Sequence, residues 1–202
     1  EKVLEDLDIK NNLPIIIATM HPIPLNIAET KRESKNFFKA LQIFSLKNSA
    51  NIIITSPNLD EGRKFIIDEI KTTLPKMKNT FYTESLGGFR YQALMSLASS
   101  RNITICGNSS SIIKEAPYYN AQCLNIGIRQ RGREKSSMQI DCMAEEFKIL
   151  ENLEKTIRAK FEKCNNPYYV ENASDKVISF IKDSFANNSR KKLINKKWNR
   201  NY

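Results

Sequence analysis

The sequence predicts an α/β protein built on a parallel sheet with helices on both faces. Short apolar runs rich in β-branched residues alternate with amphipathic segments of roughly 10–15 residues, a pattern that predicts right-handed βαβ units. All six glycines lie between these segments or within three residues of a segment end, where turns occur. The chain has 202 residues, of which 41% are hydrophobic, so it can form one domain with a single core.

Five segments have the composition of strands, and six have the spacing of helices. A parallel strand that is buried on both faces has a nearly continuous apolar sequence, as "PIIIATMHP" and "ANIIITSPN" do. The predicted strands are residues 14–22, 50–58, 79–85, 102–108 and 122–127. The predicted helices are residues 34–48, 60–74, 88–100, 110–120, 143–163 and 174–186. We expect only helices after residue 136.

The positive charge of the chain is concentrated at its C-terminal end. The net charge is +10, and the last fourteen residues hold six basic residues and no acidic one, so about +4 remains without them. We therefore predict a domain over residues 1–188 and a basic tail over residues 189–202. The tail could touch RNA or an anionic surface, but the chain has no recognisable nucleic-acid motif. We favour a solvated terminus and expect no nucleic-acid partner.

Composition also bears on the cellular compartment and on metals. No apolar run approaches the roughly 20 residues of a membrane span, and the acidic first residues do not resemble a secretion signal. The four cysteines form no CxxC pair, and His21 is the only histidine. These features predict a cytoplasmic protein with reduced cysteines, no membrane partner, no metal and no cofactor.

Polar residues follow four of the predicted strands, at the edge where ligands bind in open α/β sheets. They are His21, Asn58, the turn of residues 107–111, and Arg129. Because the carboxyl ends of parallel strands lie at one edge of the sheet, we expect these residues to converge on one rim.

The turn of residues 107–111, "GNSSS", has the chemistry of an anion site. A glycine lets the backbone approach a ligand, and serine hydroxyls and free N–H groups at a helix start can bind phosphate. The alternative is that Asn108 or Ser109 only caps the helix. Glu115 follows in the same helix; its carboxylate could accept both vicinal hydroxyls of a ribose, or it could be an ordinary exposed glutamate.

Two arginines and the histidine complete the set of candidates. Arg129 and Arg133 lie on either side of Gly132, and a guanidinium group can bind phosphate through two parallel hydrogen bonds. His21 has the only side chain whose ordinary pKa is near neutrality. It ends a strand, so we expect it to face a ligand, where it could contact a phosphate oxygen or move a proton.

Four motifs together resemble a known family. "MHPIPLN", "SPNLDEGRK", "GNSSSIIKEAP" and "NIGIRQRGRE", in this order and spacing, are similar to the C-terminal half of the hydrolysing UDP-N-acetylglucosamine 2-epimerases, in particular the sialic-acid-synthesis type. The resemblance covers about residues 10 to 185. It implies a Rossmann-like sheet, the C-terminal domain of a two-domain fold like that of glycosyltransferase-B enzymes. UDP would lie against this domain.

The resemblance also implies roles for individual residues. Ser109 and Ser110 would hold the diphosphate, Glu115 the ribose hydroxyls, and Arg129 the phosphate charge. His21 and Asn58 would line the phosphate side of the cleft, and the turn "SLGGFRYQ" would border the uracil. Among the candidates, His21 and Arg129 are the expected catalytic residues, and Arg133 completes the expected UDP contacts.

The family reaction eliminates UDP across C1 and C2 of the sugar to give a glycal, to which water then adds. The acidic residues that transfer protons would lie in an N-terminal domain that this chain does not contain. We therefore expect a chain that binds UDP and UDP-N-acetylhexosamine, is inactive alone, and belongs to a homo-oligomer in full-length form. The alternative is the donor-binding domain of a nucleotide-sugar glycosyltransferase.

Overall fold

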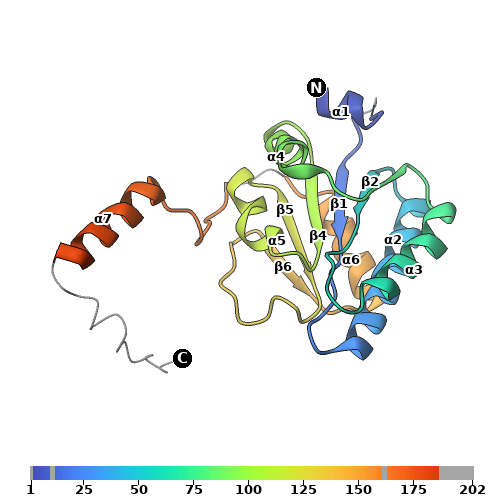
Figure 1. Ribbon diagram of the computed structural model, residues 1–202. Helices are drawn as coiled ribbons and strands as arrows, with labels where there is room; N and C mark the ends of the chain where they lie inside the picture. The colour runs from blue at the N-terminus through green and yellow to red at the C-terminus, as the bar shows by residue number, and fades with distance from the viewer. Residues whose placement is uncertain (1, 10–11, 161–162, 187–202) are drawn as a thin grey trace. The chain divides into compact units, whose positions relative to one another are not determined.

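The computed structural model describes residues 2–9, 12–160 and 163–186 (Figure 1). Six strands form one sheet in the order β3-β2-β1-β4-β5-β6, and every neighbouring pair is parallel. This is the strand order of a doubly wound, Rossmann-like sheet. The strands are β1 (Ile15–Thr19), β2 (Asn51–Thr55), β3 (Thr80–Thr83), β4 (Ile103–Gly107), β5 (Gln122–Ile126) and β6 (Gln139–Cys142).

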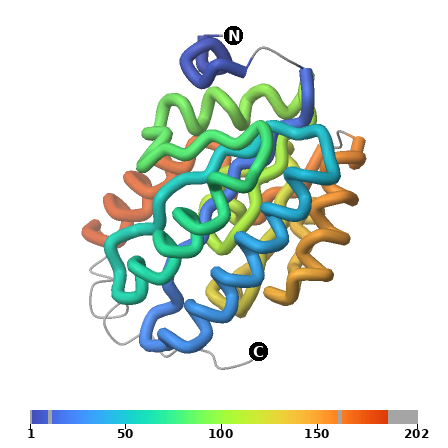
Figure 2. The backbone as a smooth tube through the Cα atoms, turned by 90° about the vertical axis from the view of Figure 1, so that its right-hand side faces the viewer, coloured from blue at the N-terminus to red at the C-terminus, as the bar shows by residue number. Residues whose placement is uncertain are grey.

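Helices cover both faces of the sheet, as predicted. One face packs against α2 (Ile27–Lys47), α3 (Arg63–Thr73) and α6 (Glu146–Thr156). Figure 2 shows α2 lying between α3 and α6 on this side. The other face packs against α1 (Lys2–Asp6), α4 (Gly87–Ser96) and α5 (Ser111–Lys114). Short 3-10 turns follow at Leu74–Lys76, Leu97–Ser99 and Ala116–Tyr119.

The central strands supply both halves of the core because their side chains alternate between the faces. In β1, Ile16 packs on the α2 side, whereas Ile15 and Ile17 pack on the α4 side. All three are fully buried. Burial on both faces explains why these strands have continuous apolar sequences rather than alternating ones.

Several element bounds differ from the sequence prediction. The strand β6 was not predicted, because "QIDC" is short and polar and lies where only helices were expected; it pairs with β5 at the edge of the sheet. The helix α2 begins seven residues before the predicted segment, with the Asn26 side chain accepting a hydrogen bond from the backbone N–H of Glu29 at 3.1 Å. The predicted helix 110–120 is divided, and α6 ends at Thr156.

The chain forms two compact units, residues 1–167 and residues 168–202. The first contains the sheet, and the second contains the amphipathic helix α7 (Ala173–Ala186). The predicted basic tail, residues 189–202, lies outside the described residues. Within the described part of the chain, no helix has the length and apolar character to span a membrane.

Candidate functional site

The candidate site lies at the carboxyl ends of β1 and β4, the two central strands. The chain leaves β1 toward α2 on one face and leaves β4 toward α5 on the other. Such a divergence between neighbouring parallel strands opens a crevice, which is the usual ligand position in this class of fold. His21 lies two residues after β1, and Asn108 follows β4 directly.

The side chain of Asn108 joins the two strand ends. Its Oδ1 accepts a hydrogen bond from the backbone N–H of His21 at 2.7 Å, and its Nδ2 donates to the backbone carbonyl of His21 at 2.9 Å. Asn108 is fully buried, and its backbone N–H donates to the Thr19 carbonyl at 3.1 Å. Its position is therefore fixed by three hydrogen bonds, and His21 is held relative to β4.

The close approach of the two strand ends depends on Gly107. It has a φ of +124°, and a Cβ atom at this position would lie 1.9 Å from the backbone oxygen of Thr19. No side chain fits there without moving the backbone of β1. The glycine predicted to allow a ligand to approach therefore first allows β1 and β4 to approach each other.

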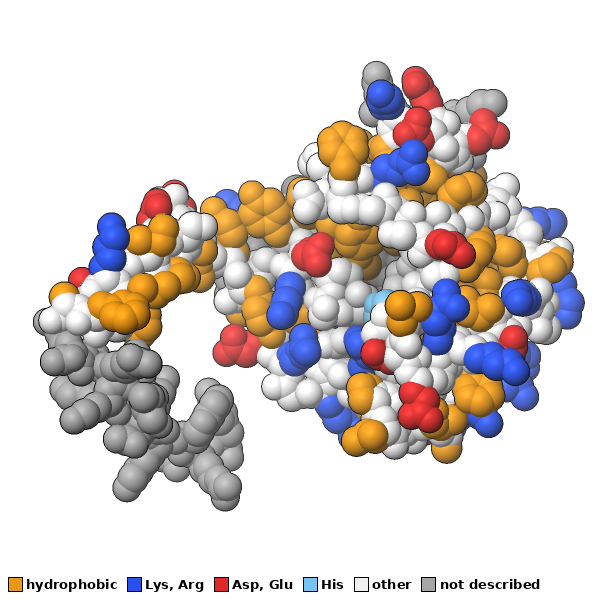
Figure 3. Space-filling view, in the orientation of Figure 1, with side chains coloured by type: hydrophobic (Ala, Val, Ile, Leu, Met, Phe, Trp, Pro, Cys, Tyr) orange, Lys and Arg blue, Asp and Glu red, His pale blue; other side chains and the backbone are white. Residues whose placement is uncertain are grey.

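The imidazole of His21 is neutral and has a defined tautomer. Its Nδ1 accepts a hydrogen bond from the backbone N–H of Asn58 at 3.0 Å, so the ring proton is on Nε2. Burial, followed by the positive charge of Arg129, lowers the pKa of His21 to about 4, while Asp60 acts in the opposite direction. At neutral pH the ring is a hydrogen-bond donor without charge. In Figure 3 the imidazole, drawn pale blue, reaches the surface between its neighbours.

Arg129 lies in the loop after β5 and is hydrogen-bonded to the segments that follow β1 and β4. Its Nε donates to the Pro22 carbonyl and its Nη1 to the Asn108 carbonyl, each at 3.1 Å. These bonds hold a half-buried guanidinium group near His21, and burial lowers the pKa of Arg129. The charge predicted to bind phosphate is thus present and fixed, with part of its donor set already used by the backbone.

The serine turn offers free donors. Among the described residues, the backbone N–H groups of Ser109 and Ser110 have no hydrogen-bond acceptor. Ser111 Oγ donates to Ser109 Oγ at 3.0 Å and lies 2.7 Å from the Tyr91 hydroxyl. Because α5 has only four residues, its dipole contributes little here, and the two N–H groups and the hydroxyls are the main anion donors.

A cavity of about 300 Å³ opens at this rim and brings together residues that end or follow β1, β2, β3 and β4. Of the predicted site residues, it contains His21, Ser109 and Glu115. Glu115 is exposed at the junction after α5, rather than within a continuous helix. The backbone of Asn58 bonds to His21, Ser110 follows Ser109 in the chain, and Arg129 bonds to the Pro22 and Asn108 carbonyls, but none of the three lines the cavity. Its lining is Thr19, His21, Thr55, Ser56, Glu84, Ser85, Leu86, Gly87, Gly88, Tyr91, Ser109, Ser111 and Glu115.

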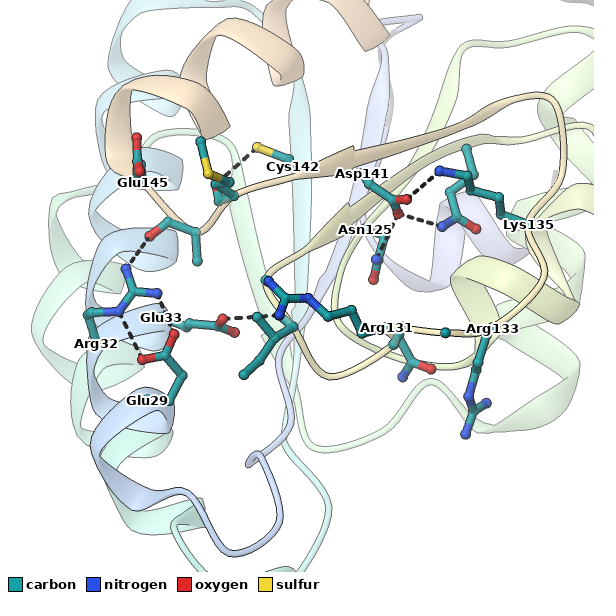
Figure 4. A pocket seen from close by; sticks show the side chains of 17 residues that line it. Glu29, Arg32, Glu33, Asn125, Arg131, Arg133, Lys135, Asp141, Cys142 and Glu145 are labelled. Carbon is teal, nitrogen blue, oxygen red and sulfur yellow. Dashed lines mark hydrogen bonds and ion pairs between the residues drawn. The ribbon is translucent and has the colours of Figure 1, made fainter. Parts of the chain in front are cut away.

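Arg133 lies elsewhere. It lines a separate cavity of about 470 Å³ between α2 and the loop from β5 to β6, which shares no lining residue with the first (Figure 4). This larger cavity also contains Glu33, whose Oε1 accepts a hydrogen bond from the backbone N–H of Ile128 at 3.1 Å. Burial raises the pKa of Glu33 to about 7.

The sequence did not single out three side chains that line the first cavity, namely Tyr91, Thr19 and Thr55. Tyr91 was included only within a turn expected to border uracil; burial raises its pKa, so its hydroxyl is protonated and bonded to Ser111. Thr19 and Thr55, which share a hydrogen bond of 2.6 Å, were assigned to strands alone. Both threonines are the last residues of their strands, and this position is the only sequence signal for them. In the described residues, no group of three or more His, Cys, Asp or Glu side chains could hold a metal ion.

Comparisons with known proteins agree on one family. The sequence profile described as UDP-N-acetylglucosamine 2-epimerase matches residues 1–182. A relative from Campylobacter jejuni, named GDP/UDP-N,N'-diacetylbacillosamine 2-epimerase (hydrolyzing), is 35% identical over 136 residues, 67% of this chain and 34% of that protein. Polysialic acid biosynthesis protein P7 of Escherichia coli is 28% identical over 171 residues, 83% of this chain and 42% of that protein.

Solved structures of proteins named as UDP-GlcNAc 2-epimerases have the same fold. The UDP-GlcNAc 2-epimerase from Neisseria meningitidis, solved bound to UDP-GlcNAc, superposes with a TM-score of 0.69 at 18% sequence identity. The match covers 90% of this chain and 48% of that one. The chain thus spans less than half the length of each of these three proteins. Because the family profile covers most of the sequence, the chain belongs to the UDP-N-acetylglucosamine 2-epimerase family.

Proposed function

We propose that this chain is the UDP-binding, C-terminal domain of a hydrolysing UDP-N-acetylhexosamine 2-epimerase, with residues 1–188 as the domain. The observation that carries the proposal is that His21, Ser109 and Glu115 line one cavity at the β1/β4 crevice. These side chains supply a neutral donor, anion donors and a carboxylate, in a chain that belongs to the epimerase family. Family membership favours this function over a glycosyltransferase donor domain.

The serine turn would hold the diphosphate. The free N–H groups of Ser109 and Ser110 and the adjoining hydroxyls are donors, and phosphate oxygens are acceptors. Glu115 would accept hydrogen bonds from the ribose hydroxyls, because an ionised carboxylate has two oxygens and several acceptor positions. The turn of residues 85–88 lines the same cavity and would border the uracil.

His21 and Arg129 would assist the departure of UDP. When the C1–O bond of the sugar breaks, negative charge develops on the diphosphate. A neutral Nε2–H of His21 and the fixed guanidinium group of Arg129 are preorganised for that charge, which is the most effective form of electrostatic stabilisation. The base that removes the proton from C2 and the group that directs water to the glycal would lie in the part of the protein outside this chain.

The sugar is expected to be an N-acetylhexosamine or a diacetylated relative. The Campylobacter jejuni protein is named for N,N'-diacetylbacillosamine and the Escherichia coli protein for polysialic acid synthesis. Both names support a place in the synthesis of sialic acid or a related surface sugar. We further propose that the full-length protein is a cytoplasmic homo-oligomer.

Calorimetric titration of this chain tests the proposal, with UDP as ligand and UMP and N-acetylmannosamine as controls. We expect UDP to bind, UMP to bind far more weakly, and N-acetylmannosamine not to bind. Glu115→Gln should weaken UDP binding by about 1.5–3 kcal/mol, the range for hydrogen bonds to charged groups. Glu5→Gln, an exposed change in α1, is the matched control. Equal affinity for UMP and UDP would argue against a diphosphate site.

A further inference from the structure

The larger cavity, shown in Figure 4, has the features of a second ligand site. It measures about 470 Å³ and lies between the first turns of α2 and the segment from the end of β5 through β6. It shares no lining residue with the candidate UDP cavity. Nothing in the proposed UDP contacts requires this space.

Four buried oxygen atoms on its wall have no hydrogen-bond donor in the described structure. They are Glu33 Oε2, Asn125 Oδ1, Gln130 Oε1 and Gln139 Oε1. Glu33 is completely buried, and Asn125 and Gln130 are each 4% exposed. An unpaired buried polar atom is unfavourable to folding, so a cluster of four around one cavity indicates donors supplied from outside the chain.

Exchanging the oxygen and nitrogen positions of the three side-chain amides would break existing hydrogen bonds, so it cannot supply the missing donors. Asn125 Nδ2 and Gln139 Nε2 both donate to Asp141 Oδ1, at 2.9 and 2.6 Å. The carboxylate accepts hydrogen bonds only, so each amide must present its NH₂ group to Asp141. Gln130 Nε2 likewise donates to the Asn108 carbonyl at 2.7 Å. All three amide oxygens are therefore left as acceptors.

Two of the four basic side chains that line this cavity form no ion pair in the described structure, although the charge of Arg131 acts on the carboxylates of Glu29 and Glu33. Lys135 pairs with Asp141 at 2.8 Å, and Arg32 pairs with Glu29. In the described part of the chain, the side chains of Arg131 and Arg133 have no hydrogen bond or ion pair. The Arg131 guanidinium extends toward Glu33 in Figure 4. Ordered water could satisfy the four oxygens, but it would leave two guanidinium groups without an ion-pair partner.

We propose that this cavity binds a monosaccharide that carries one anionic group, a phosphate or a carboxylate. The anionic group would pair with Arg131 and Arg133, and the sugar hydroxyls would donate to the buried oxygens. A hydroxylated ring has several donors at short spacing, which matches the three amide oxygens and the ionised form of the Glu33 carboxylate. A simple cation would meet repulsion from the two arginines, and a bare anion would leave the four oxygens unpaired.

The test is calorimetric titration of the whole chain with glucose 6-phosphate and with glucuronate, and with glucose and inorganic phosphate as partial ligands. We expect one or both anionic sugars to bind at least tenfold more tightly than either partial ligand. Arg131→Gln should weaken that binding about tenfold or more, as expected when a hydrogen bond to a charged group is lost. Arg158→Gln, an exposed change in the segment after α6, should leave it unchanged.

A second comparison separates this site from the UDP cavity. Glu115→Gln should leave anionic-sugar binding unchanged, and Gln139→Met, which removes one acceptor, should weaken it while the melting temperature confirms folding. The proposal is overturned if neither anionic sugar binds, if phosphate alone binds equally well, or if Arg131→Gln binds like the unaltered chain. It is also overturned if Glu115→Gln abolishes binding, because the sugar would then occupy the first cavity. The outcome does not depend on whether UDP binds.

Discussion

The side chain of Asn108 bonds to both backbone polar groups of His21, at 2.7 and 2.9 Å, across two neighbouring strands. The bond pair fixes the distance between the end of β1 and the serine turn. Arg129, in the loop after β5, donates a hydrogen bond to the Asn108 carbonyl and so links a third segment of the chain to these two. The residues proposed to contact UDP are therefore positioned by one buried amide, which itself has no atom left for the ligand.

Asn108→Asp tests this arrangement with almost no change of shape. A carboxylate can accept from the His21 N–H but cannot donate to the His21 carbonyl, and it would be buried next to that oxygen. We expect the free energy of unfolding to fall by about 3 kcal/mol at pH 8 and UDP binding to weaken. Urea unfolding measures the first effect, with Asn12→Asp, an exposed change, as control. Equal stability of both variants would contradict the role assigned to Asn108.

The protonation of His21 can be followed directly because the chain has one histidine. We expect its imidazole proton resonances to remain constant from pH 8 to about 5.5 and to titrate with a pKa of about 4. The folded state binds this proton more weakly than the unfolded chain does. His21 therefore adds stability above its ordinary pKa of 6.5, and this is lost as the pH falls toward 4. Arg129→Gln should raise the pKa, and a midpoint near 6.5 in the unaltered chain would contradict the assignment.

Glu33 should have the opposite pH dependence. Burial raises its pKa from 4.5 to about 7, so the folded state favours the protonated carboxyl. Its ionisation removes about 3 kcal/mol of stability as the pH rises from 4.5 through 7. Glu33→Gln should therefore gain about that much over the unaltered chain between pH 4.5 and pH 8. Because His21 is present in both proteins, its contribution cancels, and a constant difference across this range would refute the prediction.

Two glycine substitutions should have opposite effects. Gly107→Ala places a Cβ 1.9 Å from the Thr19 carbonyl oxygen and forces an unfavourable φ, so we expect a loss of about 3 kcal/mol or more. Gly88 lies within α4, where an added Cβ atom would meet nothing within 4 Å, so Gly88→Ala should stabilise by about 0.5–1 kcal/mol. Thermal unfolding compares the two. Similar destabilisation by both would mean that the contact with Thr19 is not the cause.

The sheet could be predicted because its central strands are apolar on both sides and its turns contain glycine. Ile15 to Thr19 and Asn51 to Thr55 lie inside the predicted segments 14–22 and 50–58, so the existence of both strands is evident from the sequence. The strand β6 has no such signal. "QIDC" is polar because it lies at the edge of the sheet, and only its pairing with β5 defines it as a strand.

The site residues that follow strands could be predicted from the sequence, but the hydrogen bonds that position them could not. His21 and Ser109 could be assigned to one rim because each follows a strand of a parallel sheet. Asn108 could be identified only as a possible cap, because its bonds to His21 join residues 87 positions apart. Glu33 resembles any polar helix residue in sequence; its burial depends on Gly127, where a Cβ would collide with its carboxylate. Such contacts between distant segments have no periodic signature.

The most direct test of the proposed function is the response of the His21 imidazole resonance to UDP in the whole chain. The proposal predicts that this resonance shifts and saturates with the dissociation constant that calorimetry gives for UDP, and that UMP shifts it far more weakly. UDP binding without a change at His21, or no binding at millimolar UDP, would contradict a UDP site at the ends of β1 and β4.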